Sequence, residues 1–240
     1  MSASRSFDLV VRLSVLRQMQ RSDDEYGWIV GDAGGKTGII LETSDGGRTF
    51  KKPDALPQAI SACFGVYVRR EVGALVFGIG FVLRSADKSR TWQSPVDLQL
   101  LGIKEVAFNV SSAAFLNDGR GWLVGQGSKG GIVLVTQDFG QSWRTEFESG
   151  SAANFRSIWI LDGKHRCVVG SRTSMFCTIG DGHTWNSRGV LSAPLVEQSH
   201  VFKNLVILAS GRGWVIQEGG YLYQTDDSGL TWHDFDPMKP

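Results

Sequence analysis

Short apolar segments alternate with glycine-rich and polar turns along the whole chain. One pattern, Gly-Trp followed by apolar residues, recurs at residues 27–31, 121–125 and 213–216, with weaker relatives at residues 74–78 and 166–170. Further apolar runs precede most of these segments, at residues 59–68, 112–116, 157–161 and 201–209. Runs of four to eight apolar residues bounded by Gly, Asp and Ser are typical of β-strands. The pattern therefore predicts an all-β protein.

A second repeated segment follows these strands in five copies. Each copy has Thr or Ser first, an acidic residue near the third position and an aromatic residue last; the copies are residues 43–50, 85–92, 136–143, 178–185 and 225–232. Their acidic residues are Asp45, Asp87, Asp138, Asp181 and Asp227. Their closing aromatic residues are Phe50, Trp92, Trp143, Trp185 and Trp232.

Each of these segments predicts a tight turn between two strands. An Asp carboxylate can accept hydrogen bonds from the backbone N–H groups that follow it, and a glycine two positions on can adopt positive φ. The closing aromatic residue can then pack between sheets. In the second copy Ser89 replaces that glycine, and in the fourth Gly180 replaces the acid and displaces Asp181 by one position. We expect looser turns in these two copies.

The two repeats combine into one unit of strand, turn, strand, glycine-rich loop, strand, Asp turn and short strand. The closing aromatic residues stand at 50, 92, 143, 185 and 232, at steps of 42, 51, 42 and 47 residues. Four antiparallel strands per roughly 45 residues are typical of one β-propeller blade. The chain is predicted to be a single propeller domain, residues 1–240, of about five four-stranded blades at residues 7–54, 58–96, 104–149, 153–190 and 200–236. A degenerate sixth blade stays open, and one interpretation has residues 7–11 pairing with the last blade.

Composition and charge limit the classes of binding partner that are expected. The 240 residues include 25 Lys and Arg against 24 Asp and Glu, a formal net charge of +1, which argues against broad binding to nucleic acid. No segment approaches the roughly 18 apolar residues of a membrane span. The first 21 residues form no apolar leader, so a cytoplasmic location is expected unless a leader has been removed.

Three cysteines, Cys63, Cys167 and Cys177, form no Cys-x-x-Cys pair. Buried free thiols are the expected state, and one disulfide between Cys167 and Cys177 on neighbouring strands stays open.

The five turn segments resemble the Asp-box, or BNR, repeat of sialidases and related propellers. Residues 27–50, with Gly-Trp-x-Val-Gly before Gly-Gly-Arg-Thr-Phe, are also similar to photosystem assembly factors of the Ycf48 type. In sialidases the Asp boxes lie on the face away from the active site, so the resemblance implies a structural role for the five acidic residues. The Arg-Ile-Pro signature of sialidases is missing from this chain.

Other chemistry finds little support. Residues 31–37 superficially look like a phosphate-binding loop but have one residue too few between the glycines and run into a strand. The four histidines show no zinc-ligand spacing. We therefore predict a protein that is not an enzyme and that uses no metal or cofactor.

The remaining candidate is a binding surface formed by the loops between the second and third strands of each blade. Loops on a regular scaffold commonly carry recognition. The predicted contact residues are Asp32, Lys36, Gln126, Lys129, Arg172 and Glu218. The predicted function is a non-catalytic protein-binding propeller: an assembly factor, a scaffold, or a stoichiometric inhibitor of the immunity type. The alternative is a carbohydrate-binding or sialidase-like glycoside hydrolase propeller.

Overall fold

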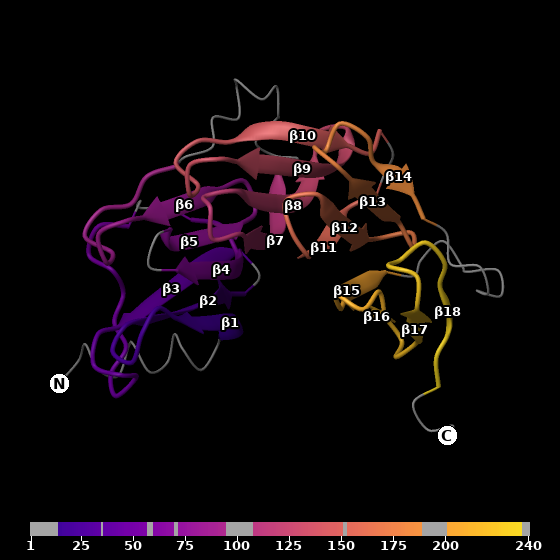
Figure 1. Ribbon diagram of the computed structural model, residues 1–240. Helices are drawn as coiled ribbons and strands as arrows, with labels where there is room; N and C mark the ends of the chain where they lie inside the picture. The colour runs from indigo at the N-terminus through magenta and orange to yellow at the C-terminus, as the bar shows by residue number, and fades with distance from the viewer. Residues whose placement is uncertain are drawn as a thin grey trace. The chain divides into compact units, whose positions relative to one another are not determined.

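The computed structural model describes residues 14–34, 36–56, 60–69, 72–94, 108–150, 153–188 and 201–236. It divides into two compact units, residues 1–110 with 138–143 and residues 111–137 with 144–240. Figure 1 labels the strands in chain order. The described residues contain strands, turns and loops and no helix, which confirms the all-β class; none of them forms a helix suited to crossing a membrane. The predicted pairing of residues 7–11 lies outside the described residues, and the single domain 1–240 stays a prediction.

The strands of the described residues form five antiparallel sheets, numbered in chain order. Sheet 1 contains β1 (Ser14–Arg21), β2 (Gly27–Ala33) and β3 (Thr37–Thr43). Sheet 2 contains β4 (Cys63–Arg69), β5 (Gly73–Gly78) and β6 (Val82–Ser85). Sheet 3 contains β7 (Asn109–Phe115), β8 (Gly121–Gly127), β9 (Gly130–Thr136) and β10 (Arg144–Glu148). Sheet 4 contains β11 (Phe155–Ile160), β12 (His165–Gly170), β13 (Met175–Ile179) and β14 (Asn186–Ser187). Sheet 5 contains β15 (Phe202–Ile207), β16 (Gly213–Gln217), β17 (Leu222–Thr225) and β18 (His233–Asp234).

Every sheet is a meander in which neighbouring strands follow one another in the chain. Sheets 3, 4 and 5 have four strands. In sheets 1 and 2 the fourth strand is reduced to one bridge, Glu42 with Lys51 and Arg84 with Gln93. The predicted order of strand, turn, strand, loop, strand and Asp turn is therefore present in all five sheets.

Within each unit, apolar side chains of one sheet pack against the neighbouring sheet. In unit 1 the buried cluster combines Trp28, Val30 and Ile40 of sheet 1 with Val66, Val68, Ala74 and Val76 of sheet 2. In unit 2 one cluster joins Trp122, Val124, Val133 and Val135 of sheet 3 to Phe155, Ile158 and Val168 of sheet 4. A second cluster in unit 2 joins sheet 4 to Phe202, Leu205, Val215, Tyr223 and Trp232 of sheet 5. Central strands such as β8, β9 and β12 are buried along almost their whole length, so they bury apolar surface on both faces of their sheets.

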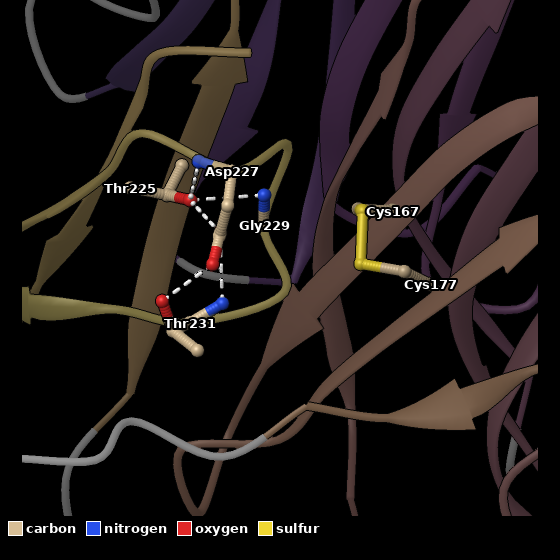
Figure 2. The surroundings of a disulfide bond; sticks show 6 residues. All are labelled: Cys167, Cys177, Thr225, Asp227, Gly229 and Thr231. Carbon is tan, nitrogen blue, oxygen red and sulfur yellow. Dashed lines mark hydrogen bonds between the residues drawn. A yellow bond between two sulfur atoms is a disulfide. The ribbon is translucent and has the colours of Figure 1, made fainter.

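Sheet 4 departs from the repeat at the tryptophan position. Cys167 stands where sheets 1 and 3 have Trp28 and Trp122, and it forms a disulfide with Cys177 directly across the β12–β13 pair (Figure 2). The two Cα atoms are 4.1 Å apart. The expectation of free thiols is therefore wrong for these two cysteines, because the strand register places them opposite each other. Cys63 is a buried free thiol.

Candidate functional site

The Asp227 turn of sheet 5 has a complete internal hydrogen-bond network (Figure 2). The hydroxyl of Thr225 and the backbone N–H of Thr231 donate to Asp227 Oδ1, at 2.7 and 2.9 Å. The Thr231 hydroxyl donates to Oδ2 at 2.6 Å, and the N–H of Gly229 donates to the Thr225 hydroxyl oxygen at 2.9 Å. Both carboxylate oxygens are therefore engaged inside the turn.

Three other copies repeat this arrangement. Asp45, Asp87 and Asp138 each accept the backbone N–H of the residue four positions on, at 2.9 Å in every copy. The hydroxyl of that same residue, Thr or Ser, donates to the second oxygen at 2.6 to 2.7 Å. The residue four positions on is thus held through its backbone and its side chain by one carboxylate.

These hydrogen bonds lower the pKa of the carboxyl groups of Asp45, Asp87 and Asp227. Side-chain and backbone donation from Thr91 lowers the pKa of Asp87 to about 2, and the same donors from Thr49 lower the pKa of Asp45. Partial burial opposes ionisation of Asp227, but donation from Thr231 and Thr225 outweighs it and brings the pKa to about 2. A general acid needs a pKa near the working pH. These groups are therefore unsuited to proton donation at neutral pH.

The second Asp turn is as complete as the others, so the expectation of a looser turn there is wrong. Ser89 adopts positive φ of 65° without glycine, and its N–H donates to the Ser85 hydroxyl oxygen at 2.9 Å. The Ser89 hydroxyl oxygen accepts a buried hydrogen bond of 2.8 Å from Trp28 Nε1. A serine thus bonds an indole of the neighbouring sheet, which a glycine could not do.

The fourth Asp turn is different in kind. Asp181 is exposed and forms no side-chain hydrogen bond or ion pair with any described residue. At the same end of sheet 4, Arg166 is 1% exposed, and its Nη2 atom lies 3.0 Å from Glu146 Oε1. Its guanidinium carbon lies 4.8 Å from the ring centroid of Trp122.

Sequence reasoning missed this buried pair. Glu146 also accepts a hydrogen bond of 3.2 Å from Trp122 Nε1, and Arg166 donates to the carbonyl oxygen of Gly163. The available signal was an arginine at the glycine position of the Gly-Trp repeat. The pair lines a polar crevice with Arg120 and His183, but its charges are already matched within the protein.

The other ends of the sheets, called the loop ends here, carry the loops between the second and third strands. Asp32 is the one predicted contact that the structure contradicts. It is 1% exposed, and Arg17 Nε lies 2.7 Å from its Oδ2 atom. The β1–β2 register sets β1 against the end of β2, so the carboxylate faces Arg17 inside sheet 1.

The other predicted contacts lie in or beside these loops. Lys36, in unit 1, is exposed. In unit 2, Lys129 pairs with Glu148 at 3.3 Å and Glu218 pairs with Lys203 at 2.9 Å. The Gln126 side-chain oxygen accepts a hydrogen bond of 3.3 Å from Asn154 Nδ2. Arg172 is exposed at the tip of the β12–β13 loop. Gln126, Lys129, Arg172 and Glu218 therefore come from three successive sheets of one unit.

No protein-family model and no curated protein matches this sequence. Solved structures do match over nearly its whole length. A GH74 xyloglucanase from Xanthomonas campestris has a TM-score of 0.66 at 14% identity, covering 90% of this chain and 37% of that one. Ycf48 from Cyanidioschyzon merolae has a TM-score of 0.52 at 17% identity, covering 94% and 86%. The WD40 β-propeller domain of Doa1 has a TM-score of 0.57 at 12% identity, covering 91% and 67%.

The fold is a β-propeller. Identities of 12 to 17% establish the fold alone. The five sheets are the propeller's blades, and the predicted count of about five is confirmed. This chain covers only 37% of the length of the GH74 xyloglucanase.

Proposed function

We propose that this chain is a non-catalytic, protein-binding propeller of the Asp-box type that recognises its partner through the loop ends of sheets 3, 4 and 5. The observation that carries the proposal is the contrast between the two ends of these sheets. At the turn ends the carboxylates of Asp138 and Asp227 are saturated by hydrogen bonds within their own turns. At the loop ends, charged side chains such as Lys129 and Arg172 are exposed.

This contrast separates a scaffold from a recognition surface. A carboxylate held by three donors stabilises its turn, and at Asp227 the lowered pKa also removes the group from acid catalysis. Exposed charged residues on loops set partner choice and association rate. The assembly-factor, scaffold and stoichiometric-inhibitor roles all use such a surface.

The disulfide bears on where the protein works. Cys167–Cys177 bonds of this kind persist in oxidising compartments and are rare in the cytosol. The disulfide therefore favours an oxidising compartment over the cytoplasmic location expected from the sequence.

A carbohydrate-active propeller is the second candidate, favoured by the TM-score of 0.66 to the GH74 xyloglucanase.

The test of the proposal is affinity purification of the tagged full chain from its native lysate, with Lys129→Glu/Glu218→Lys as the loop-end variant. Arg144→Glu/Asp181→Lys, at the turn ends of sheets 3 and 4, is the matched control with the same net charge.

One stoichiometric protein that is recovered with wild type and the control, and lost with the loop-end variant, supports the proposal. Binding to xyloglucan or sialosides on a glycan array, with no stoichiometric protein recovered, favours the second candidate. A protein partner that the control variant loses equally contradicts the choice of surface.

A further inference from the structure

Three arginines are located in the segments at the loop end of sheet 4. Arg156 is the second residue of β11, Arg172 lies in the β12–β13 loop, and Arg188 follows β14. Phe155 pairs with Gly170, and the N–H of Arg188 donates to the carbonyl oxygen of Met175 at 2.8 Å. These pairings place the backbone of all three arginines at the same end of the sheet.

No acidic residue of sheet 4 accompanies them. Within residues 153–188 the acidic residues are Asp162 and Asp181, and both lie in turns at the opposite end. None of the three arginines forms an ion pair with a described residue, and Arg188 Nε is buried without a hydrogen-bond partner there. The neighbouring loop ends differ, because their lysines are neutralised by the ion pairs of Glu148 and Glu218.

The β12–β13 loop holds its arginine in a costly backbone conformation. Arg172 and Thr173 have φ of 55° and 50°, whereas the corresponding loops of sheets 3 and 5 use Gly130 at 110° and Gly219 at 93°. Residues other than glycine are disfavoured in this region, so this loop presents Arg172 at a conformational cost that the loops of sheets 3 and 5 avoid. The loop is also fixed by the disulfide beneath it and by donation from Asn154 N–H to the Ser171 hydroxyl, at 2.8 Å.

We propose that Arg156, Arg172 and Arg188 bind an acidic, extended segment of the partner protein, which deepens the proposed function and rests on it. A guanidinium group is always charged and pairs with a carboxylate through two parallel hydrogen bonds. Neutralising three arginines that form no ion pair within the described part of the chain gives the partner's carboxylates a specific location on the propeller.

The spacing of the three arginines selects the form of the ligand. Adjacent strands lie about 4.8 Å apart, so positions at the first strand, between the second and third, and at the fourth are spaced by about 7 Å. Alternate side chains on one face of an extended peptide are also spaced by about 7 Å. The site therefore matches a peptide with acidic residues at every second position. A single phosphate group is too small to contact all three arginine positions at once.

The experiment measures binding of fluorescein-labelled peptides to the full chain by anisotropy at low salt. One peptide alternates three glutamates with threonines, a second has the same composition with its glutamates in one block, and a third contains only threonine. The alternating peptide is expected to bind at least tenfold more tightly than the threonine peptide and at least threefold more tightly than the blocked one.

The variant Arg156→Gln/Arg172→Gln/Arg188→Gln is expected to lose at least tenfold in affinity. Its matched control, Arg90→Gln/Arg144→Gln/Lys164→Gln, removes three exposed cations outside the loop ends and is expected to stay within twofold. Equal losses in both variants, or equal affinity for the alternating and threonine peptides, overturns the proposal. Inorganic phosphate or an RNA oligonucleotide that displaces the peptide at equal charge concentration also overturns it. A native partner that binds the arginine variant normally but is lost with Lys129→Glu/Glu218→Lys sinks this inference while the proposed function stands.

Discussion

Replacing Asp227 by alanine tests how much one Asp turn contributes to stability. The carboxylate accepts three hydrogen bonds, from the Thr225 hydroxyl and from the N–H and hydroxyl of Thr231. A hydrogen bond to a charged group contributes about 1 kcal/mol net at a partly exposed position such as this one. Asp227→Ala is therefore expected to reduce the free energy of unfolding by about 3 kcal/mol.

Two further variants separate these hydrogen bonds from side-chain volume. Asp227→Asn keeps one acceptor oxygen, and its amide nitrogen can donate to the Thr231 hydroxyl oxygen, so the expected loss is about 1 kcal/mol. Asp181→Ala removes a carboxylate of the same size from the fourth Asp turn, where no described residue bonds to it. Its effect is expected within about 0.5 kcal/mol, the range of an ordinary surface substitution.

Urea unfolding followed by tryptophan fluorescence provides the measurement, because Trp232 closes the Asp227 turn and is fully buried. The free energies of unfolding are compared only between variants in which the dependence of free energy on urea concentration has the same slope. A changed slope indicates a change in the compactness of the unfolded or native state. A loss below 0.5 kcal/mol for Asp227→Ala would refute the reasoning. An equal loss of stability for Asp181→Ala would also refute it, because Asp181 has no such hydrogen bonds with the described residues and the loss could then not be caused by them.

Other predictions concern the buried ion pair, the disulfide and acid stability. Glu146→Ala leaves the Arg166 guanidinium buried and unpaired, so urea unfolding should show a loss of about 3 kcal/mol, whereas Glu146→Leu with Arg166→Met should stay within about 1 kcal/mol of wild type. Reduction of Cys167–Cys177 reopens a loop with a sequence separation of 10 residues, and unfolding with and without dithiothreitol should differ by about 3 kcal/mol. The pKa of Asp87 is about 2 when folded against an ordinary 3.8, so the unfolded chain binds more protons between these values. Its stabilisation should persist above about pH 4 and disappear toward pH 2, which an acid series of urea midpoints checks; a flat series would contradict this.

The strands and turns could be predicted because their causes are local. Alternating apolar residues specify the strands, and an acid, a hydroxyl and a residue able to take positive φ are all encoded within eight positions. That chemistry predicts turns at all five repeats, including the one in which Asp181 leaves the network.

Features that depend on long-range pairing were beyond the sequence. Ser89 was expected to weaken its turn, but its bonding partner Trp28 lies 61 residues earlier. Asp32 was expected at the surface, but the register of β1 against β2 places Arg17 beside it. The Cys167 disulfide likewise required the exact β12–β13 alignment, which two separate apolar runs do not specify.

Sheet 4 is the described sheet that contains a disulfide, and this affects how readily its backbone opens locally. In the other sheets a carboxylate closes the Asp turn through hydrogen bonds that do not depend on redox conditions. In sheet 4 the β12–β13 hairpin is joined by the Cys167–Cys177 disulfide, which a reductant can break. Under reducing conditions the amide hydrogens of this hairpin should exchange with solvent sooner than those of β16 and β17. Local opening would then begin at the hairpin that carries Arg172, so the redox state of the surroundings would set how long the loop end of sheet 4 keeps its shape.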